Sequence, residues 1–142
     1  MKSLLIVSKV MLAIIGLTLL LNAEAWGEDW KYLGQNDDRL FFYYPENITH
    51  PSRGVVRACG KTDYTEKGII RMVEKFGSRY ENLKYSLDLW ELKCAQNTIR
   101  ILATTHYSRN GEVLDSKKND HAKWKSIVPG SVEDSLQKAV CK

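Results

Sequence analysis

The chain has 142 residues, a formal net charge of +4 and 27% charged side chains. This length supports one modest hydrophobic core but not two. The positive charge is small and spread along the chain, so it gives no footprint for nucleic acid binding. We therefore expect a single small domain that has no nucleic acid partner.

Residues 1–25 carry the features of a secretory signal peptide in the usual order. Lys2 and Lys9 supply positive charge, residues 10–21 carry no charge, and Ala23-Glu24-Ala25 is a small-x-small cleavage signature. The uncharged stretch is shorter than the roughly 20 apolar residues that a bilayer-spanning helix needs. We predict cleavage after Ala25, which leaves residues 26–142 as one domain with no membrane span. Two lysines and one glutamate leave with the signal, so the formal charge falls from +4 to +3.

No cysteine lies near the predicted cleavage site, so the sequence offers no attachment point for a bacterial lipid anchor. We therefore expect an exported protein that is periplasmic, secreted or at the cell surface. Export permits disulfides, and Cys59, Cys94 and Cys141 allow three different pairings. We favour Cys94 with Cys141, because this bridge would fasten a C-terminal helix to the end of a strand. Cys59 lies inside a predicted strand and is expected to act as a small buried hydrophobe.

The first part of the mature chain has the composition of short strands. Residues 30–33 and 40–44 predict a hairpin around the turn residues 35–38, and residues 54–64 predict a third strand. Residues 47–52 are expected to form a loop. From Thr65 the apolar period changes to three and four residues, so we predict an inserted amphipathic helix that ends at Gly77.

Residues 83–108 predict a long hairpin that forms the centre of the sheet. Apolar residues alternate through Tyr85, Leu87 and Leu89, and the parity then shifts to Trp90 and Leu92. A β-bulge at Leu89-Trp90 would cancel this shift. With a two-residue turn at 96–97, the expected pairs put all the apolar positions on one face. These pairs are Cys94 with Ile99, Leu92 with Ile101, Trp90 with Ala103, Leu87 with Thr105 and Tyr85 with Tyr107.

The last third of the chain predicts one more hairpin strand and a final helix. Asn110-Gly111 is a strong hairpin turn signal, and residues 113–116 return as a strand. Residues 117–125 are polar and irregular. Ser131 is a suitable N-cap for a helix with one apolar face, formed by Val132, Leu136, Ala139 and Val140. The predicted fold class is α+β, an antiparallel sheet of about five or six strands with a short inserted helix and a C-terminal helix packed on one face.

Several motifs make the chain similar to a known family of envelope proteins. They are Trp30-Lys31-Tyr32, Tyr43-Tyr44-Pro45, the run from Lys61 to Thr65, the run from Leu89 to Cys94, and the ending from Ile127 through Cys141. On these residues the chain resembles the bacterial surface-adhesin protein E family over nearly all of residues 28–142. The resemblance implies an antiparallel sheet with a C-terminal helix, an envelope location and no catalysis.

The namesake of that family binds host matrix and serum proteins, and it is a lipoprotein. This chain departs from it, because it has no lipidation cysteine. Cys94 and Cys141 match the family's cysteine positions, whereas Cys59 is a local addition. The resemblance transfers no binding residue position by position.

The residues show no pattern of catalytic or metal-ligating side chains. His50, His106 and His121 are far apart and share no metal-ligand spacing, so we expect no metal site and no cofactor. Neither a Gly-x-Ser-x-Gly elbow nor a local Ser/His/Asp signature is present, and we expect no enzyme activity. A small hydrolase would require a pocket in which a Ser or Asp meets His106 or His121.

One basic stretch stands out as a candidate binding surface: Lys117, Lys118, Lys123, Trp124 and Lys125. It could contact an acidic partner, or it could be a solvated loop whose Trp124 ring packs on the sheet. The sequence therefore favours a non-catalytic exported protein that binds a protein or polysaccharide in the envelope or outside the cell. The alternative is a periplasmic structural or accessory subunit of an envelope assembly, formed through unpaired sheet edges. The oligomeric state does not follow from the sequence.

Overall fold

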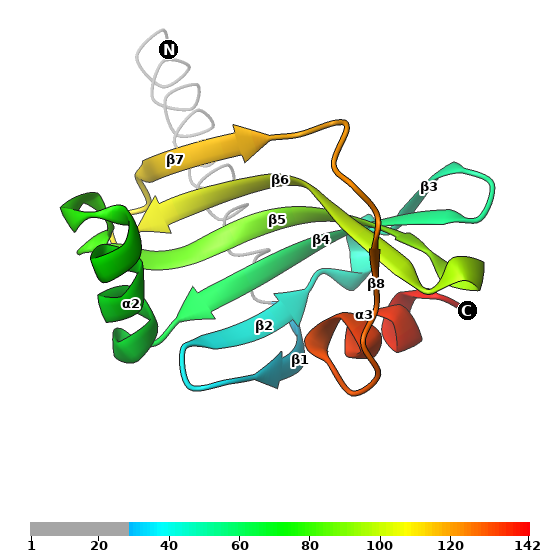
Figure 1. The fold of residues 1–142 in the computed structure, drawn as a ribbon, viewed down its shortest axis with the longest axis horizontal. Coiled ribbons are helices and arrows are strands. Elements are labelled where there is room, and N and C mark those ends of the chain that lie inside the picture. Colours follow the sequence, from blue (N-terminus) through cyan, green and yellow to red (C-terminus); the bar gives the residue numbers. More distant parts are fainter. Residues whose placement is uncertain (1–28) are drawn as a thin grey trace, which may run out of the picture.

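A computed structural model describes residues 29–142, so the predicted signal peptide lies outside the described residues. The chain forms one antiparallel sheet with the strand order β1-β2-β4-β5-β6-β7, and β3 and β8 pair with β4 and β6 (Figure 1). The strands are β1 (Lys31–Gln35), β2 (Arg39–Tyr43), β3 (Thr49–Ser52), β4 (Val55–Tyr64), β5 (Leu83–Lys93), β6 (Thr98–Ser108), β7 (Val113–Lys118) and β8 (Lys125–Ser126). The helices are α2 (Glu66–Phe76) and α3 (Val132–Val140), with short 3-10 turns at Pro45–Asn47, Ser78–Tyr80 and Cys94–Gln96.

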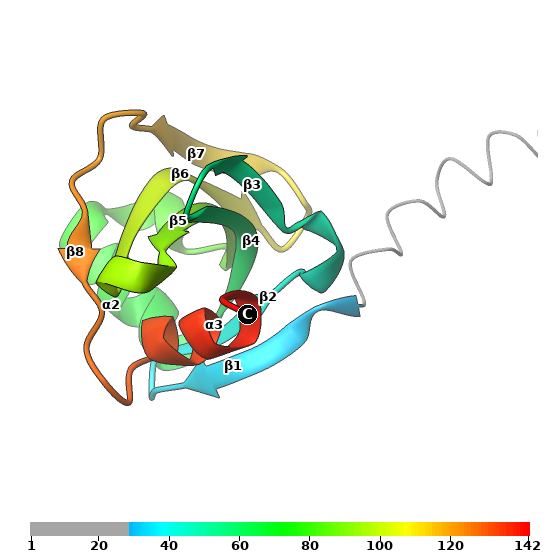
Figure 2. The same cartoon turned by 90° about the vertical axis from the view of Figure 1, so that its right-hand side faces the viewer.

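The sheet curls, and both helices lie on its concave side (Figures 1 and 2). Figure 2 shows the strands arching around α3, while Figure 1 shows α2 at the opposite ends of the strands. The predicted α+β class, with its inserted helix and its C-terminal helix on one face, is confirmed. The strand number is slightly higher than expected, because residues 49–52 and 125–126 add two short strands.

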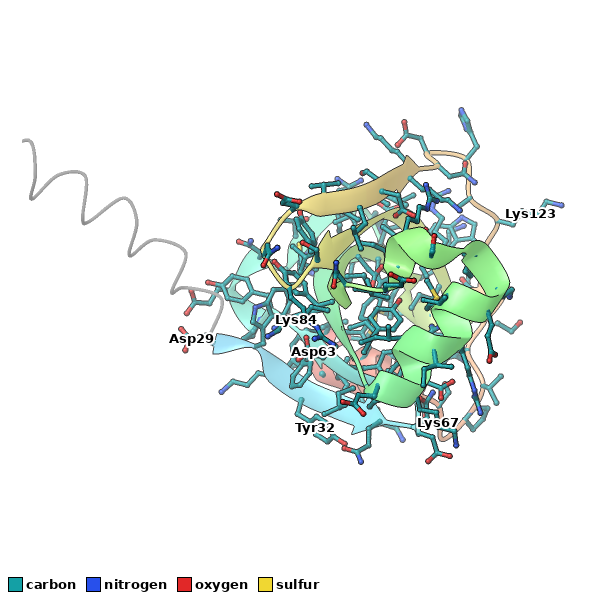
Figure 3. All side chains as sticks on the ribbon, turned by 90° about the vertical axis from the view of Figure 1, so that its left-hand side faces the viewer. Asp29, Tyr32, Asp63, Lys67, Lys84 and Lys123 are labelled. Atoms are coloured by element: carbon teal, nitrogen blue, oxygen red, sulfur yellow. A yellow bond between two sulfur atoms is a disulfide. The ribbon has the colours of Figure 1, made fainter. Side chains whose placement is uncertain are left out.

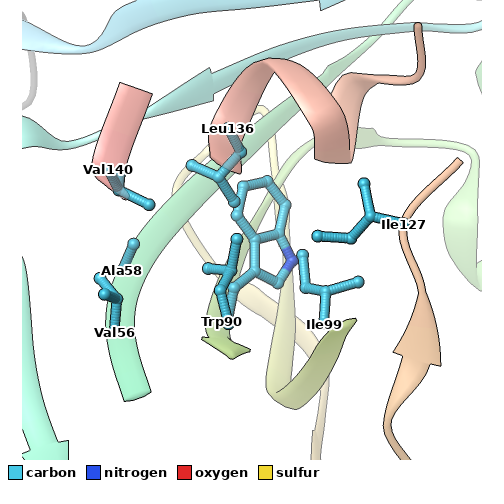
Figure 4. Close-up of a cluster of buried hydrophobic side chains, with 8 residues drawn as sticks. Val56, Ala58, Trp90, Ile99, Ile127, Leu136 and Val140 are labelled. Atoms are coloured by element: carbon cyan, nitrogen blue, oxygen red, sulfur yellow. The ribbon is translucent and has the colours of Figure 1, made fainter. Parts of the chain in front are cut away.

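The core beside α3 surrounds the indole of Trp90 (Figure 4). Leu136 and Val140 of α3 pack against it from above the sheet, which accounts for the apolar face predicted for this helix. Gly60 lies beneath the ring, and a Cβ atom at this position would come within 2.5 Å of the Trp90 side chain. The other buried members of this cluster are Val56, Ala58, Leu92, Ile99 and Ile127.

A second, smaller core lies beside α2, where Met72, Tyr80 and Leu83 are buried. The boundaries of α2 follow from its end residues. The Thr65 side chain caps the first turn by accepting a hydrogen bond from the Gly68 N–H, and Gly77 ends the helix with a φ of 106°. Both boundaries agree with the sequence prediction. The two cores are separate, so the middle of the concave face is not filled by apolar packing.

Gly68 fixes how closely α2 approaches the β1–β2 turn. A Cβ atom there would lie 2.1 Å from the Asp38 carbonyl oxygen, a backbone atom that cannot rotate away. We predict that Gly68→Ala destabilises the fold by about 1–3 kcal/mol through overpacking, although Ala favours a helix interior by about 1 kcal/mol. Urea unfolding would measure this, with Ile70→Ala, an exposed change on the same helix, as control. An increase in stability for Gly68→Ala would contradict the prediction.

The central hairpin forms at the predicted place, but three of its five predicted pairs are wrong. Leu87 pairs with Thr105 and Tyr85 with Tyr107, as predicted. Beyond the register shift, Trp90 pairs with Ile101 and Leu92 with Ile99 instead of the predicted partners. The cause is the turn, because the 3-10 turn Cys94–Gln96 and the left-handed Asn97 replace the predicted two-residue turn.

The extra residue of the bulge is Leu102 on β6, which has no partner between the pairs Leu89–Ala103 and Trp90–Ile101. From Tyr85 to Lys93, strand β5 therefore keeps its alternation, and the expectation of a single apolar face is wrong. Ser86, Asp88, Trp90 and Leu92 face the helices. Leu87 and Leu89 face the other side of the sheet.

Two predicted irregular segments contain regular structure. Residues 49–52, expected to be loop, form β3 against β4, and β7 continues to Lys118, two residues beyond its predicted end.

At the C-terminus, Cys94 and Cys141 form a disulfide with their Cα atoms 5.7 Å apart, while Cys59 is free. The bridge fastens the end of α3 to the β5–β6 turn, the arrangement that was favoured from the sequence.

Candidate functional site

The space between the two cores is a cavity of about 620 Å³ on the concave face of the sheet. Its floor is polar and is formed by Thr62, Tyr64, Ser86, Asp88, Thr104 and His106. Apolar side chains close its ends, with Met72 and Phe76 at the α2 end and Trp90, Ile99 and Val132 at the α3 end. The segment between β7 and α3 borders the opening with Asn119, Ala122, Lys123 and Lys125.

The strand register explains why these polar residues meet. Phe41, Thr62, Ser86, His106 and Asp115 are consecutive partners across β2, β4, β5, β6 and β7. Directly paired residues project from the same face of a sheet, so this row crosses the whole concave floor. The neighbouring row is formed by Gly60, Asp88, Thr104 and Lys117.

Asp88 is the acidic group at the centre of the floor. Its carboxylate accepts hydrogen bonds from the Thr104 hydroxyl at 2.7 Å and the Thr62 hydroxyl at 3.4 Å. Burial raises the pKa of Asp88 above its ordinary range, although these hydrogen bonds act in the opposite direction. The two threonines thus replace part of the hydration that the carboxylate loses in the cavity.

His106 connects the floor to the α2 core. Its Nδ1 lies 2.6 Å from Asp115 Oδ1 and its Nε2 lies 3.3 Å from the Tyr64 hydroxyl. Tyr80 also donates to Asp115, and Arg79 forms an ion pair with the same carboxylate. Burial alone would raise the pKa of Asp115, but the hydrogen bonds from Tyr80 and His106 bring it below its ordinary value.

A His–Asp pair in a cavity is one element of a nucleophilic active site. From the sequence, a pocket in which a Ser or Asp meets His106 was the requirement for a small hydrolase. The third partner of this pair is Tyr64, and burial raises the pKa of the Tyr64 hydroxyl, which disfavours the phenolate. Ser86, the partner of His106 in the β5–β6 register, is only 1% exposed. Neither hydroxyl is thus an exposed, activated nucleophile, and the arrangement orients hydrogen-bonding groups without presenting one.

The predicted basic stretch does not form one continuous patch. Lys123 and Lys125 border the cavity, and Figure 3 shows Lys123 projecting outward from its segment. Lys117 pairs with Thr104 and Lys118 with Ala103, so their side chains project from opposite faces of β7. Lys118 lies 4.0 Å from Asp120 in an exposed ion pair. The structure therefore brings Lys117, Lys123 and Lys125 to the cavity side and separates Lys118 from them.

Trp124 contacts a charge cluster around the buried Glu91, which the sequence did not reveal. Lys93 Nζ and Arg100 Cζ lie 4.5 Å and 4.4 Å from its ring centroid. Arg100 donates from Nε and Nη2 to one Glu91 oxygen at 3.0 and 2.7 Å, and Arg57 donates to the other at 3.1 and 2.8 Å. Trp124 thus attaches the segment between β7 and α3 to the central hairpin.

The convex face of the sheet carries an apolar groove of about 460 Å³. Its lining is formed by Trp30, Tyr44, Asn47, Cys59, Leu87, Asp88, Leu89 and Ala103. Neither described helix covers this face (Figure 2). Cys59 is half-buried, and burial raises the pKa of its thiol, so the reactive thiolate is disfavoured. This agrees with the expectation of a small hydrophobe, although Cys59 faces the outer groove and not the core.

Within residues 29–142, no three His, Cys, Asp or Glu side chains come together in a group that could hold a metal ion. None of the helices in the same part of the chain is long and apolar enough to cross a membrane.

Comparison with known proteins gives one match. The family model described as surface-adhesin protein E matches residues 30–142. No curated protein and no solved structure matches the chain.

Proposed function

We propose that this chain, which belongs to the surface-adhesin protein E family, is a non-catalytic exported envelope protein that binds another macromolecule. The family match over residues 30–142 carries this proposal, because it includes every described strand and both helices. A surface adhesin acts at the outside of the cell, which agrees with the expected signal peptide at residues 1–25.

The binding surface we propose is the mouth of the concave cavity together with the basic stretch of residues 117–125. Lys117, Lys123 and Lys125 lie on the cavity side, and the ordered contacts of Trp124 hold this segment against the hairpin. Exposed lysines around a recess favour an acidic partner, because complementary charge accelerates encounter and orients the complex.

Charge reversal at this stretch tests the proposal. We expect glutamate at Lys117, Lys118, Lys123 and Lys125 to weaken binding to immobilised basement-membrane extract or serum proteins at least tenfold, without loss of folding. The matched control reverses four exposed lysines elsewhere, Lys31, Lys75, Lys84 and Lys142, and so has the same net charge. Equal binding by the two variants would remove the basic stretch from the proposed surface.

A periplasmic accessory subunit of an envelope assembly is the second candidate, and the uncovered apolar groove on the convex face favours it. The two candidates differ in location and in partner. Digestion by protease on intact cells would support the adhesin. Protection until the outer membrane is opened, together with copurification of a stoichiometric envelope partner, would support the accessory subunit.

A further inference from the structure

Arg39 places a cationic group in the concave cavity without an acidic partner. It is half-buried opposite Tyr64, with its Cζ 5.3 Å from the Tyr64 ring centroid. Among residues 29–142, no carboxylate lies within ion-pair distance of its guanidinium. The Tyr64 ring packs against one face of the guanidinium. The N–H groups of the guanidinium remain available to a planar anion. A carboxylate matches this fork with two parallel hydrogen bonds.

The floor beside Arg39 is suited to hydroxyl groups. Thr62 and Thr104 each use their one hydroxyl proton on Asp88, so both hydroxyl oxygens keep lone pairs that can accept. The Asp88 carboxylate has further acceptor capacity as well. This part of the cavity therefore offers acceptors, and a ligand that fits it must supply donors.

The cavity volume of about 620 Å³ is in the range of small-molecule sites. Charge and hydrogen bonding distinguish between the classes of ligand that could fill it. A hydrocarbon chain would cover Asp88 without giving it a hydrogen bond, which is unfavourable. A cationic ligand would meet Arg39 and Lys125, both of which line the cavity. A sugar supplies hydroxyl donors for the floor, and its C–H faces can pack on Phe41 and Trp90, which also line the cavity.

We propose that the concave cavity binds a sugar that carries a carboxylate group, with Arg39 holding the carboxylate and the Asp88, Thr62 and Thr104 floor accepting from the hydroxyls. This inference rests on the proposed function, because it names the ligand class for the same cavity. The sugar acid can be a free monosaccharide or the terminal unit of a larger acidic glycan, since the cavity is open on one side.

The test is titration of the purified protein with glucuronic acid, followed by amide chemical shifts in NMR spectra. We expect saturable shifts in the strands around Arg39, Asp88 and Thr104, and much weaker effects from glucose and from hexanoate. Arg39→Gln should weaken glucuronate binding about tenfold or more, because it removes a charged hydrogen-bond pair. Arg53→Gln, an exposed change on the β3–β4 turn, is the control for lost positive charge.

The outcomes separate this inference from the proposed function. Equal shifts with glucose and glucuronate, or equal affinity of the Arg39→Gln protein, would show that Arg39 does not hold a carboxylate. Tighter binding of hexanoate would identify an apolar-acid site, and the absence of saturable shifts would show that the cavity takes no sugar acid. Each of these results overturns the inference. The proposed function would still stand if the lysine-reversed protein had lost macromolecular binding and its control had kept it.

Discussion

Replacing Cys94 and Cys141 together by serine is expected to lower the free energy of unfolding by about 4 kcal/mol. The bridge spans 47 residues, so its loss gives the unfolded chain a large increase in conformational entropy. The loss of the bridge would destabilise α3 first, because the last turn of this helix packs Val140 onto the Trp90 core. For a domain of this size, thermal unfolding should shift down by roughly 15 °C.

The free cysteine provides the matched control for this experiment. Cys59→Ser makes the same chemical change at a half-buried position that forms no bridge, and we expect a loss of about 1 kcal/mol or less. Reduction of the native protein should reproduce the instability of the double variant. If the double variant and Cys59→Ser unfolded at the same temperature, the bridge would not stabilise the protein.

The elements of this fold could be predicted because their signals are local. Thr65 and Gly77 mark the ends of α2, and Ser131 marks the start of α3, through hydrogen bonds and backbone angles formed within a few residues. The long hairpin was also recognisable from its alternation. Its register was harder, because that depends on the turn, and the four-residue turn containing Asn97 was not recognised from its composition.

The cavity could not be predicted, because the pattern of polarity on β5 has two explanations. Ser86 and Asp88 alternate with Leu87 and Leu89, which normally indicates that the polar residues face water. Here the polar residues face the helices, because the core is divided into two clusters and the space between them remains polar. Only the register across the three strands β4, β5 and β6 brings Thr62, Asp88 and His106 together.

The alternation of side chains along a strand also explains why the basic stretch does not form one continuous patch. Adjacent lysines in the sequence suggested one surface, but strand β7 includes both Lys117 and Lys118, and successive strand residues face opposite sides. Lys123 and Lys125 are two residues apart and both line the cavity, whereas Trp124 between them contacts Lys93 and Arg100. Arg39 was not considered as a site residue from the sequence, because its separation from the other cavity residues gives no local motif.

Glu91 is the second position at which a large effect is expected. It is 3% exposed, and it receives paired hydrogen bonds from Arg57 and Arg100, which approach from the neighbouring strands β4 and β6. Burial alone would raise the pKa of Glu91, but the hydrogen bonds and charges of the two arginines hold it below its ordinary value. The cluster also provides the cation on which the Trp124 ring rests.

Glu91→Gln is expected to lower the free energy of unfolding by about 3 kcal/mol at neutral pH, because two guanidinium groups lose their shared anion. Because the folded-state pKa of Glu91 is lowered, its stabilisation is complete above the ordinary glutamate pKa of about 4.3 and is lost as pH falls through the folded value. The stability difference between the native protein and Glu91→Gln should therefore be largest at neutral pH and shrink in acid. Urea unfolding from pH 7 down to pH 3 would measure this, with the exposed Glu74→Gln on α2 as control. A difference that stayed constant across this range would show that the anion is not the source of the stabilisation.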